Sequence, residues 1–110
     1  MKNGIEIINE ERWRQIEMEG WTPEHDAEHK NGELADAAAC YAMTEHTKVY
    51  LWRRGMTVSR KPDCPLFFPF EPQLWKPCPD DRIHELAKAG ALIAAEIDRL
   101  LLEQGEEVEN

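Results

Sequence analysis

Two histidines, His25 and His29, stand four residues apart in the segment GWTPEHDAEH at residues 20–29. On a helix this spacing places both imidazoles on one face, where they could share a metal ion. The run H-D-A-E-H differs from the H-E-x-x-H motif of zinc proteases at Asp26, and the shorter carboxylate weakens the zinc-water mechanism. No third ligand follows at a sensible distance. We therefore favour a polar helix face with two titrating histidines, and His25 and His29 remain weak metal candidates.

A second set of candidate metal ligands consists of carboxylates on two expected helices. Glu33 and Asp36 are three residues apart and share a helix face, and Glu96 or Asp98 on the last helix could oppose them. All-helical nucleotide pyrophosphohydrolases hold magnesium with such facing carboxylate pairs. The spacing is also generic for any acidic helix, so a solvated face is the default interpretation. A magnesium-dependent enzyme of this kind is an alternative.

The charges divide the chain into three parts. Residues 1–47 and 62–110 each carry four bases and eleven acids, whereas residues 48–61 carry five bases and no acid. The overall charge of −9 makes duplex DNA a poor partner. Arg53 and Arg54 lie near Tyr50 and Trp52, and arginine forks with aromatic rings suit a small anion such as a nucleotide. The alternative is an exposed edge whose basic side chains discourage strand pairing.

The three cysteines are Cys40, Cys64 and Cys78, an odd number at irregular spacing. This argues against a disulfide framework and for reduced thiols. Cys78 precedes His84 by six residues, a weak signal for nucleophilic chemistry. We expect neither catalysis nor a cofactor.

Helices are expected at residues 9–19, 23–30, 32–46 and 80–104. Thr22 is a good N-cap for the second helix, and Asp80 or Asp81 for the last. Gly20 and Gly105 are natural stops for the first and last helices.

The last expected helix carries an apolar stripe at helical spacing, formed by Ile83, Leu86, Ala87, Gly90, Ile93, Ala94, Ile97 and Leu101. The small residues Gly90 and Ala94 are expected to let it pack closely against Ala35, Ala38 and Ala42.

The middle of the chain, residues 47–79, is expected to be an irregular insertion. Two short strands at 49–52 and 56–59 would form a β-hairpin within residues 48–60. Residues 62–79, which we call the strap, hold six of the seven prolines together with several aromatic residues, whose rings we expect to pack across the helices. The sequence thus predicts one mainly α domain over residues 1–110: three or four helices including a long C-terminal one, a Pro- and aromatic-rich strap, a short hairpin, and a flexible acidic tail at 105–110.

No stretch approaches eighteen uncharged apolar residues, and the opening residues MKNGIEIINEER lack the apolar core of a signal peptide. We therefore expect a protein of the cytoplasm that does not associate with membranes.

The opening ERWRQIEMEGWTPEHDAEH and the closing KAGALIAAEIDRL resemble a group of small proteins from bacteriophages and prophages. More distantly, the pattern is similar to the ryanodine-receptor repeat domain, whose characteristic positions would be Trp13, Gly20-Trp21-Thr22, Asp26, His29-Lys30, and Lys88 with Gly90. The His-Pro and Pro-Tyr elements that usually follow in that domain are missing from this chain.

The resemblance implies a compact helical, non-enzymatic module that binds a nucleotide-derived molecule, and a phage copy in the host cytoplasm could sequester a host defence signal. The expected ligand-binding residues are Trp13, Trp21, Thr22, His25, Asp26, Arg53, Arg54 and Lys88. A protein that binds and inhibits a host protein is a further alternative. An Ala-rich helix face or exposed aromatic residues could also pair subunits into a homo-oligomer.

Overall fold

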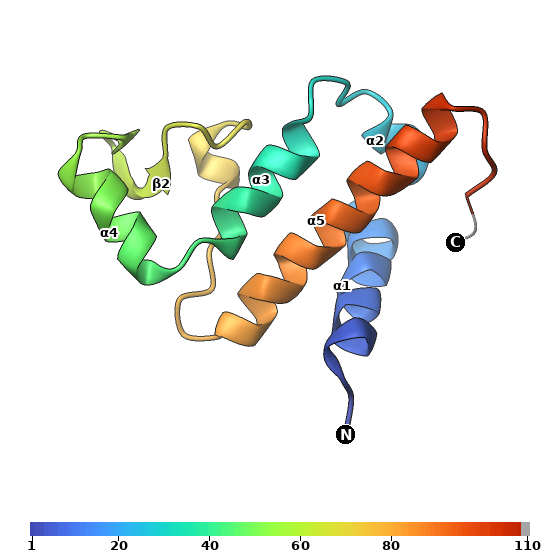
Figure 1. Ribbon diagram of the computed structural model, residues 1–110, viewed down its shortest axis with the longest axis horizontal. Coiled ribbons are helices and arrows are strands. Elements are labelled where there is room, and N and C mark those ends of the chain that lie inside the picture. Colours follow the sequence, from blue (N-terminus) through green and yellow to red (C-terminus); the bar gives the residue numbers. More distant parts are fainter. Residues whose placement is uncertain (109–110) are drawn as a thin grey trace.

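The computed structural model describes residues 1–108, which form five α-helices, a short 3-10 helix and a two-stranded antiparallel sheet (Figure 1). The elements in chain order are α1 (Gly4–Glu19), α2 (Pro23–Asp26), α3 (Glu33–Ala42), α4 (Glu45–Arg53), β1 (Thr57–Val58), β2 (Lys61–Pro65), η1 (Pro72–Leu74) and α5 (Arg82–Glu103). The predicted mainly helical fold with a long C-terminal helix is therefore confirmed. Of the tail expected at 105–110, residues 109–110 lie outside the described residues.

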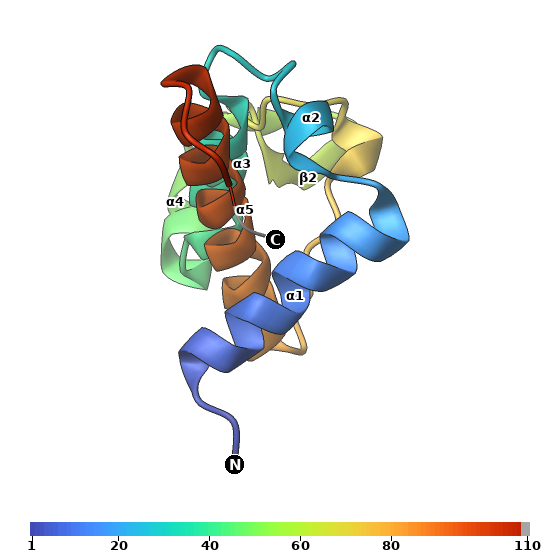
Figure 2. The same cartoon turned by 90° about the vertical axis from the view of Figure 1, so that its right-hand side faces the viewer.

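The long helix α5 is the element on which the others pack. Figures 1 and 2 show α3 lying alongside it and α1 crossing it from another side. Its start is fixed by Asp81, whose side chain accepts the N–H of His84 at 3.1 Å, as predicted for the N-cap. In the described part of the chain, no helix combines the length and the apolar character needed to cross a membrane.

The face of α5 that packs inward differs from the predicted one. Its buried residues are Glu85, Ala87, Ala89, Ala91, Leu92, Ala95 and Arg99. Ile83, Ile93 and Ile97 of the predicted inner stripe are instead 66%, 49% and 52% exposed. Because α5 carries apolar residues on both sides, packing can select the alanine-rich side, where short side chains let neighbouring helices approach closely. An apolar stripe therefore remains on its outer side.

The predicted packing of α3 along α5 is confirmed, but Gly90 permits the approach of α1 rather than that of α3. A Cβ atom at position 90 would lie 2.6 Å from Cδ1 of Ile8, so the crossing of α1 over α5 needs glycine here. Of the alanines predicted to face α5, Ala38 is buried, whereas Ala35 and Ala42 are exposed.

The helix α1 is longer than predicted. It begins at Gly4 instead of residue 9, because Oδ1 of Asn3 accepts the N–H of Glu6 at 3.0 Å and caps the helix there. It ends, as predicted, at Gly20, whose φ of +73° lies in the left-handed region that glycine adopts without steric cost.

The helix α2 is shorter than predicted. The hydroxyl of Thr22 accepts the N–H of His25 at 3.3 Å, which confirms the predicted N-cap. The helix ends at Asp26 rather than at residue 30, and the N–H of His29 donates to the carbonyl of Asp26 at 3.0 Å in the turn that follows. His29 therefore lies outside the helix on which the sequence placed it.

The segment predicted as the first strand of the hairpin is helical. The helix α3 stops at Ala42 because Thr44 caps a new helix, its hydroxyl accepting the N–H of Thr47 at 3.2 Å. Residues 49–52 belong to this helix, α4, and only Leu51 among them is buried, so the segment shows no strand-like alternation. The β-hairpin follows α4 in the chain, and Val58 of β1 pairs with Lys61 of β2. It lies at residues 57–65 instead of 48–60.

The strap closes the core with two of its aromatic rings. Trp75 is 1% exposed and stacks on Tyr41 with ring centroids 4.6 Å apart, while its indole N–H donates to Asp63 at 3.1 Å. Phe68 is buried beside both rings. Phe67, in contrast, is 44% exposed, so only some of the aromatic rings of the strap pack across the helices.

Candidate functional site

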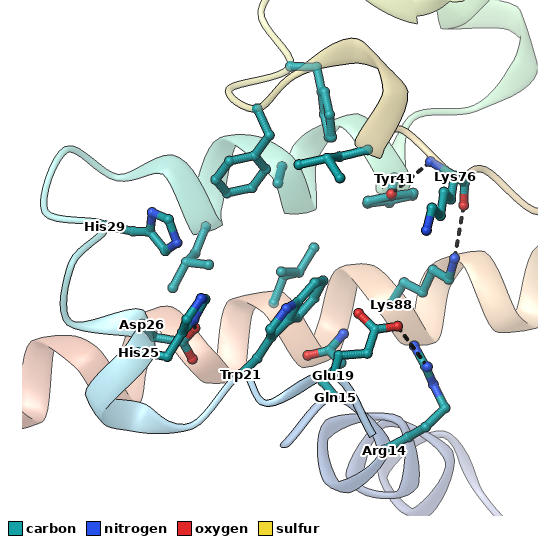
Figure 3. A pocket seen from close by; sticks show the side chains of 16 residues that line it. Arg14, Gln15, Glu19, Trp21, His25, Asp26, His29, Tyr41, Lys76 and Lys88 are labelled. Carbon is teal, nitrogen blue, oxygen red and sulfur yellow. Dashed lines mark hydrogen bonds and ion pairs between the residues drawn. The ribbon is translucent and has the colours of Figure 1, made fainter. Parts of the chain in front are cut away.

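A cavity of about 430 Å³ lies between α3 and the strap on one side and the junction of α1 with α2 on the other (Figure 3). We call it the interhelical cavity. Most of its lining is aromatic or aliphatic, with a few charged and amide groups. The lining residues are Arg14, Gln15, Glu19, Trp21, His25, Asp26, His29, Leu34, Ala37, Tyr41, Phe68, Phe70, Leu74, Lys76, Lys88 and Leu92.

The wall formed by the α1–α2 junction is held in place by Arg12. Its guanidinium donates to the carbonyl of Trp21 at 3.1 Å and to the carboxylate of Asp26, also at 3.1 Å. Asp98 of α5 lies 3.7 Å from the same guanidinium. Burial raises the pKa of Asp98, and the attraction of Arg12 opposes this effect. Arg12 thus joins α1, the Gly20–Thr22 turn, α2 and α5 behind the cavity.

Aromatic rings from three segments meet on the opposite wall and at one end of the cavity. Phe68 and Phe70 of the strap lie edge to face with centroids 5.8 Å apart, and Phe68 meets Tyr41 of α3 at 6.4 Å. His29 lies edge to face with Phe70 at 5.2 Å and with His25 at 5.5 Å. These contacts leave a mainly apolar slot with two imidazoles at one end.

Two lysines mark the other end of the cavity (Figure 3). The ammonium of Lys88 donates to the carbonyl of Lys76 at 2.8 Å and lies 5.5 Å from the ring centroid of Tyr41. The Tyr41 hydroxyl accepts the N–H of Lys76 at 3.2 Å, which fixes this end of the strap against α3. An ammonium has three N–H donors, so Lys88 keeps two for another acceptor.

The side-chain amide of Gln15 lines the same cavity from α1. Gln15 is 1% exposed, and its Oε1 atom has no hydrogen-bond partner among the described residues. A buried amide oxygen without a partner costs on the order of 1–3 kcal/mol, so such atoms are rare in folded proteins.

Five of the eight sequence-predicted ligand residues lie at or beside this cavity. Trp21, His25, Asp26 and Lys88 line it, and Thr22 caps the helix that carries His25. The carboxylate of Asp26 is 1% exposed and is engaged by Arg12, so its contact with a ligand is limited and its role in the wall is structural.

The other three predicted residues lie elsewhere. Arg53 and Arg54 line a shallow depression on α4, at the opposite end of the molecule from α2 (Figure 1). Arg54 covers the ring of Tyr50 at 4.7 Å, so the expected pairing of arginine with an aromatic ring forms, but away from the cavity. Trp13 lies on the exposed side of α1 and is 37% exposed.

Sequence reasoning missed Gln15, Tyr41, Lys76 and the two phenylalanines as cavity residues. Gln15 is three residues after Arg12 and shares its helix face, which is the one local sign that it points inward. Phe68 and Phe70 were expected to pack on the helices, but nothing in their spacing indicates that a cavity remains beneath them.

The carboxylates considered for magnesium are Glu33, Asp36, Glu96 and Asp98. Within residues 1–108, no group of three or more His, Cys, Asp and Glu side chains is placed to hold a metal ion. Glu96 accepts the guanidinium N–H of Arg99 at 2.5 Å, and Asp98 faces Arg12. The geometry of these carboxylates therefore gives no support to the magnesium-dependent alternative.

No family model matches the chain, and neither a curated protein nor a solved structure is similar enough to it to count as a match.

Proposed function

We propose that the protein binds a small anionic, nucleotide-derived ligand in the interhelical cavity and that it is not an enzyme. Sites for small molecules commonly enclose about 300–1,000 Å³ and are mainly apolar, with a few polar groups that set orientation. A cavity of about 430 Å³ with aromatic walls, two lysines and one amide fits this description.

The aromatic part of the ligand would lie in the slot between Trp21 and the rings of Tyr41 and Phe70. Trp21 is half-buried and packs against the core while lining the cavity, so one part of its ring remains available. Stacking of a base on such rings contributes about 1–3 kcal/mol per base.

The anionic part would lie at the lysine end. Charge-assisted hydrogen bonds from an ammonium to phosphate are about twice as strong as neutral ones. Lys88 and Lys76 lie on α5 and the strap, so a phosphate held between them would also join these two segments.

The single observation that carries the proposal is the Lys88 ammonium at one end of a mainly apolar cavity. An apolar cavity alone could be a packing defect, but an ammonium that keeps two N–H donors at its end suits the anionic group of a ligand. A phosphate joined to an aromatic base combines this charge with this apolar surface.

The resemblance to phage proteins and to the ryanodine-receptor repeat domain extends the proposal. A phage accessory protein with this cavity would act by sequestering a nucleotide-derived defence signal in the cytoplasm of the host.

A thermal-shift screen tests the proposal with mono-, di- and cyclic nucleotides, ADP-ribose, magnesium and zinc as probes. A ligand at 100 times its dissociation constant stabilises a protein by about 2.7 kcal/mol, which is easily detected in a domain of this size. A shift with one nucleotide class supports the proposal. A shift with metal ions alone would contradict it in favour of a metal site, and no shift with any probe would favour a protein partner.

A further inference from the structure

A cysteine, a histidine and a glutamate from three different segments form a row outside the interhelical cavity. Sγ of Cys78, in the strap, lies 3.6 Å from Nδ1 of His84 in the first turn of α5. Nε2 of the same imidazole lies 3.3 Å from Oε1 of Glu11 on α1. A thiol, a base and a carboxylate that orients the base are the three parts of an activated nucleophile.

The contact of His84 with Glu11 determines which nitrogen of the imidazole can accept the proton of Cys78. A carboxylate that accepts the Nε2–H proton leaves Nδ1 of His84 unprotonated and directed at the thiol. Glu11 is 5% exposed, and its pKa lies below its ordinary value: burial raises it, but Arg14 and His84 together lower it more. Glu11 is therefore ionised at neutral pH and can stabilise the imidazolium that forms when His84 takes the thiol proton.

The other two cysteines lack this environment. Cys40 and Cys64 are both 0% exposed, and burial raises the pKa of the Cys40 thiol to about 12. Cys78 is partly exposed, and the side chain of His84 is 40% exposed, so a small molecule can reach the thiol. Of the three thiols, only Cys78 is both accessible and paired with a base.

We propose that Cys78, His84 and Glu11 form a nucleophilic thiol centre that reacts with low-molecular-weight disulfides. The proton of the thiol passes to Nδ1 of His84, and the thiolate attacks one sulfur of the disulfide. The disulfide bond breaks as a mixed disulfide forms on Cys78, and the departing thiolate takes the proton back from His84. One disulfide and one protein thiol thus give one mixed disulfide and one free small thiol.

Three other charged side chains lie around Cys78. Glu85 of α5 accepts the backbone N–H of Cys78 at 3.0 Å, and its negative charge opposes the thiolate. Arg82 and Lys48, at 2.8 and 3.4 Å, balance Glu85. His84 is thus the base that directly faces the sulfur, so its removal should slow the reaction of Cys78.

The experiment measures the rate at which the folded, full-length protein reacts with 5,5′-dithiobis-(2-nitrobenzoic acid), from mildly acidic to basic pH. The folded protein should consume one equivalent, mapped to Cys78 by mass spectrometry and absent in Cys78→Ser. His84→Gln should slow the reaction at least about tenfold at neutral pH, because the base that takes the thiol proton is then missing, and should react like the unmodified protein in base. Glu11 acts as a positioning residue, and Glu11→Gln should slow the reaction at neutral pH but not in base, as the His84 variant does.

His46→Gln is the matched control, because His46 is an exposed histidine of α4. It should leave the rate unchanged. A variant that consumes three equivalents of the reagent is unfolded, because Cys40 and Cys64 are then exposed as well. If His84→Gln behaves in this way, His84→Asn is used in its place. The proposal is overturned if the folded His84 variants react like the unmodified protein at every pH, or if Cys78 does not react faster than a free thiol at neutral pH.

Discussion

The guanidinium of Arg12 lies 3.1 Å from the carboxylate of Asp26, and the two side chains are 8% and 1% exposed. This buried ion pair joins α1 to α2 across the turn that carries Trp21. Since Arg12 also donates to the carbonyl of Trp21, the pair determines where one wall of the interhelical cavity lies.

Breaking this pair should destabilise the fold strongly. Arg12→Ala leaves Asp26 as an uncompensated buried charge, and the expected cost is about 3–5 kcal/mol of unfolding free energy in urea. Lys2→Ala is the control, because Lys2 and Glu10 form a pair at 2.7 Å that is more than half exposed and worth about 0–1 kcal/mol. Equal costs for the two substitutions would show that Arg12 is not buried as described.

Shortening a side chain should cost more unfolding free energy on the inner side of α5 than on its outer side. Leu92 is 3% exposed in the core, so Leu92→Ala is expected to cost about 2–5 kcal/mol. Ile93 is 49% exposed, and Ile93→Ala should cost clearly less in dilute protein. Urea denaturation measures both. If Ile93→Ala costs as much as Leu92→Ala, either the inner face of α5 is misassigned or a second copy of the chain covers the outer stripe. Sedimentation velocity distinguishes these two outcomes, because it measures whether the protein is a monomer or a dimer.

Acid should weaken the fold through Glu85. Burial alone would raise its pKa, but hydrogen bonds from Arg82 and the Cys78 N–H, together with Lys48, bring it below the ordinary value of 4.5. The folded protein therefore binds this proton less tightly than the unfolded chain. The resulting stability is complete above about pH 4.5 and is lost as the pH falls through the folded-state pKa.

Urea titrations from neutral pH to about pH 3 test this effect, and Glu85→Gln should flatten the acid limb of the stability curve. Asp98 acts in the opposite direction. Its pKa is raised in the folded protein, so its protonation as the pH falls stabilises the folded protein relative to the unfolded chain. Asp98→Asn should therefore steepen the acid limb. Identical pH dependence in both variants and the unmodified protein would contradict the assignment.

Ligand binding should change the fluorescence of Trp21. Of the four tryptophans, Trp75 is buried in the core and Trp52 is 57% exposed on α4, whereas Trp21 lines the cavity. The change on adding a nucleotide should be lost in Trp21→Phe and kept in Trp52→Phe. A response that survives in Trp21→Phe would place the ligand elsewhere.

Local signals in the sequence were sufficient for three of the helix ends, namely the end of α1 and the starts of α2 and α5. Gly20, Thr22 and Asp81 act through their own backbone or through an N–H three residues away, so their roles depend on neighbouring residues only. Thr44 carries the same kind of signal for α4, but the run at 49–52 was predicted as a strand and the cap was not recognised. Within α4, Leu51 is the buried residue.

The choice of packing face could not be read from the sequence. Leu92 and Ile93 are adjacent and equally apolar, yet only Leu92 enters the core. The crossing of Ile8 over Gly90 decides where α1 lies, and this contact joins residues 82 positions apart. Such choices follow from close packing between helices, not from the spacing within one helix.

The structure brings only some of the predicted site residues together, for a related reason. Trp21, His25 and Lys88 line one cavity because α2 packs on α5. Arg53 and Arg54 were assigned to the same site by charge alone, and charge carries no information about distance. Gln15, which lines the cavity from α1, has an ordinary sequence context.

The most direct test of the proposed function is isothermal titration calorimetry with the nucleotide that gives the largest thermal shift. Three proteins are compared: the unmodified protein, Lys88→Gln, and the double variant Arg53→Ala with Arg54→Ala. Loss of one charge-assisted hydrogen bond of about 1.5–3 kcal/mol should weaken binding by roughly ten- to a hundred-fold in Lys88→Gln. The double arginine variant should bind like the unmodified protein. Binding that survives in Lys88→Gln and disappears in the arginine variant would place the site on α4 and contradict the assignment to the interhelical cavity.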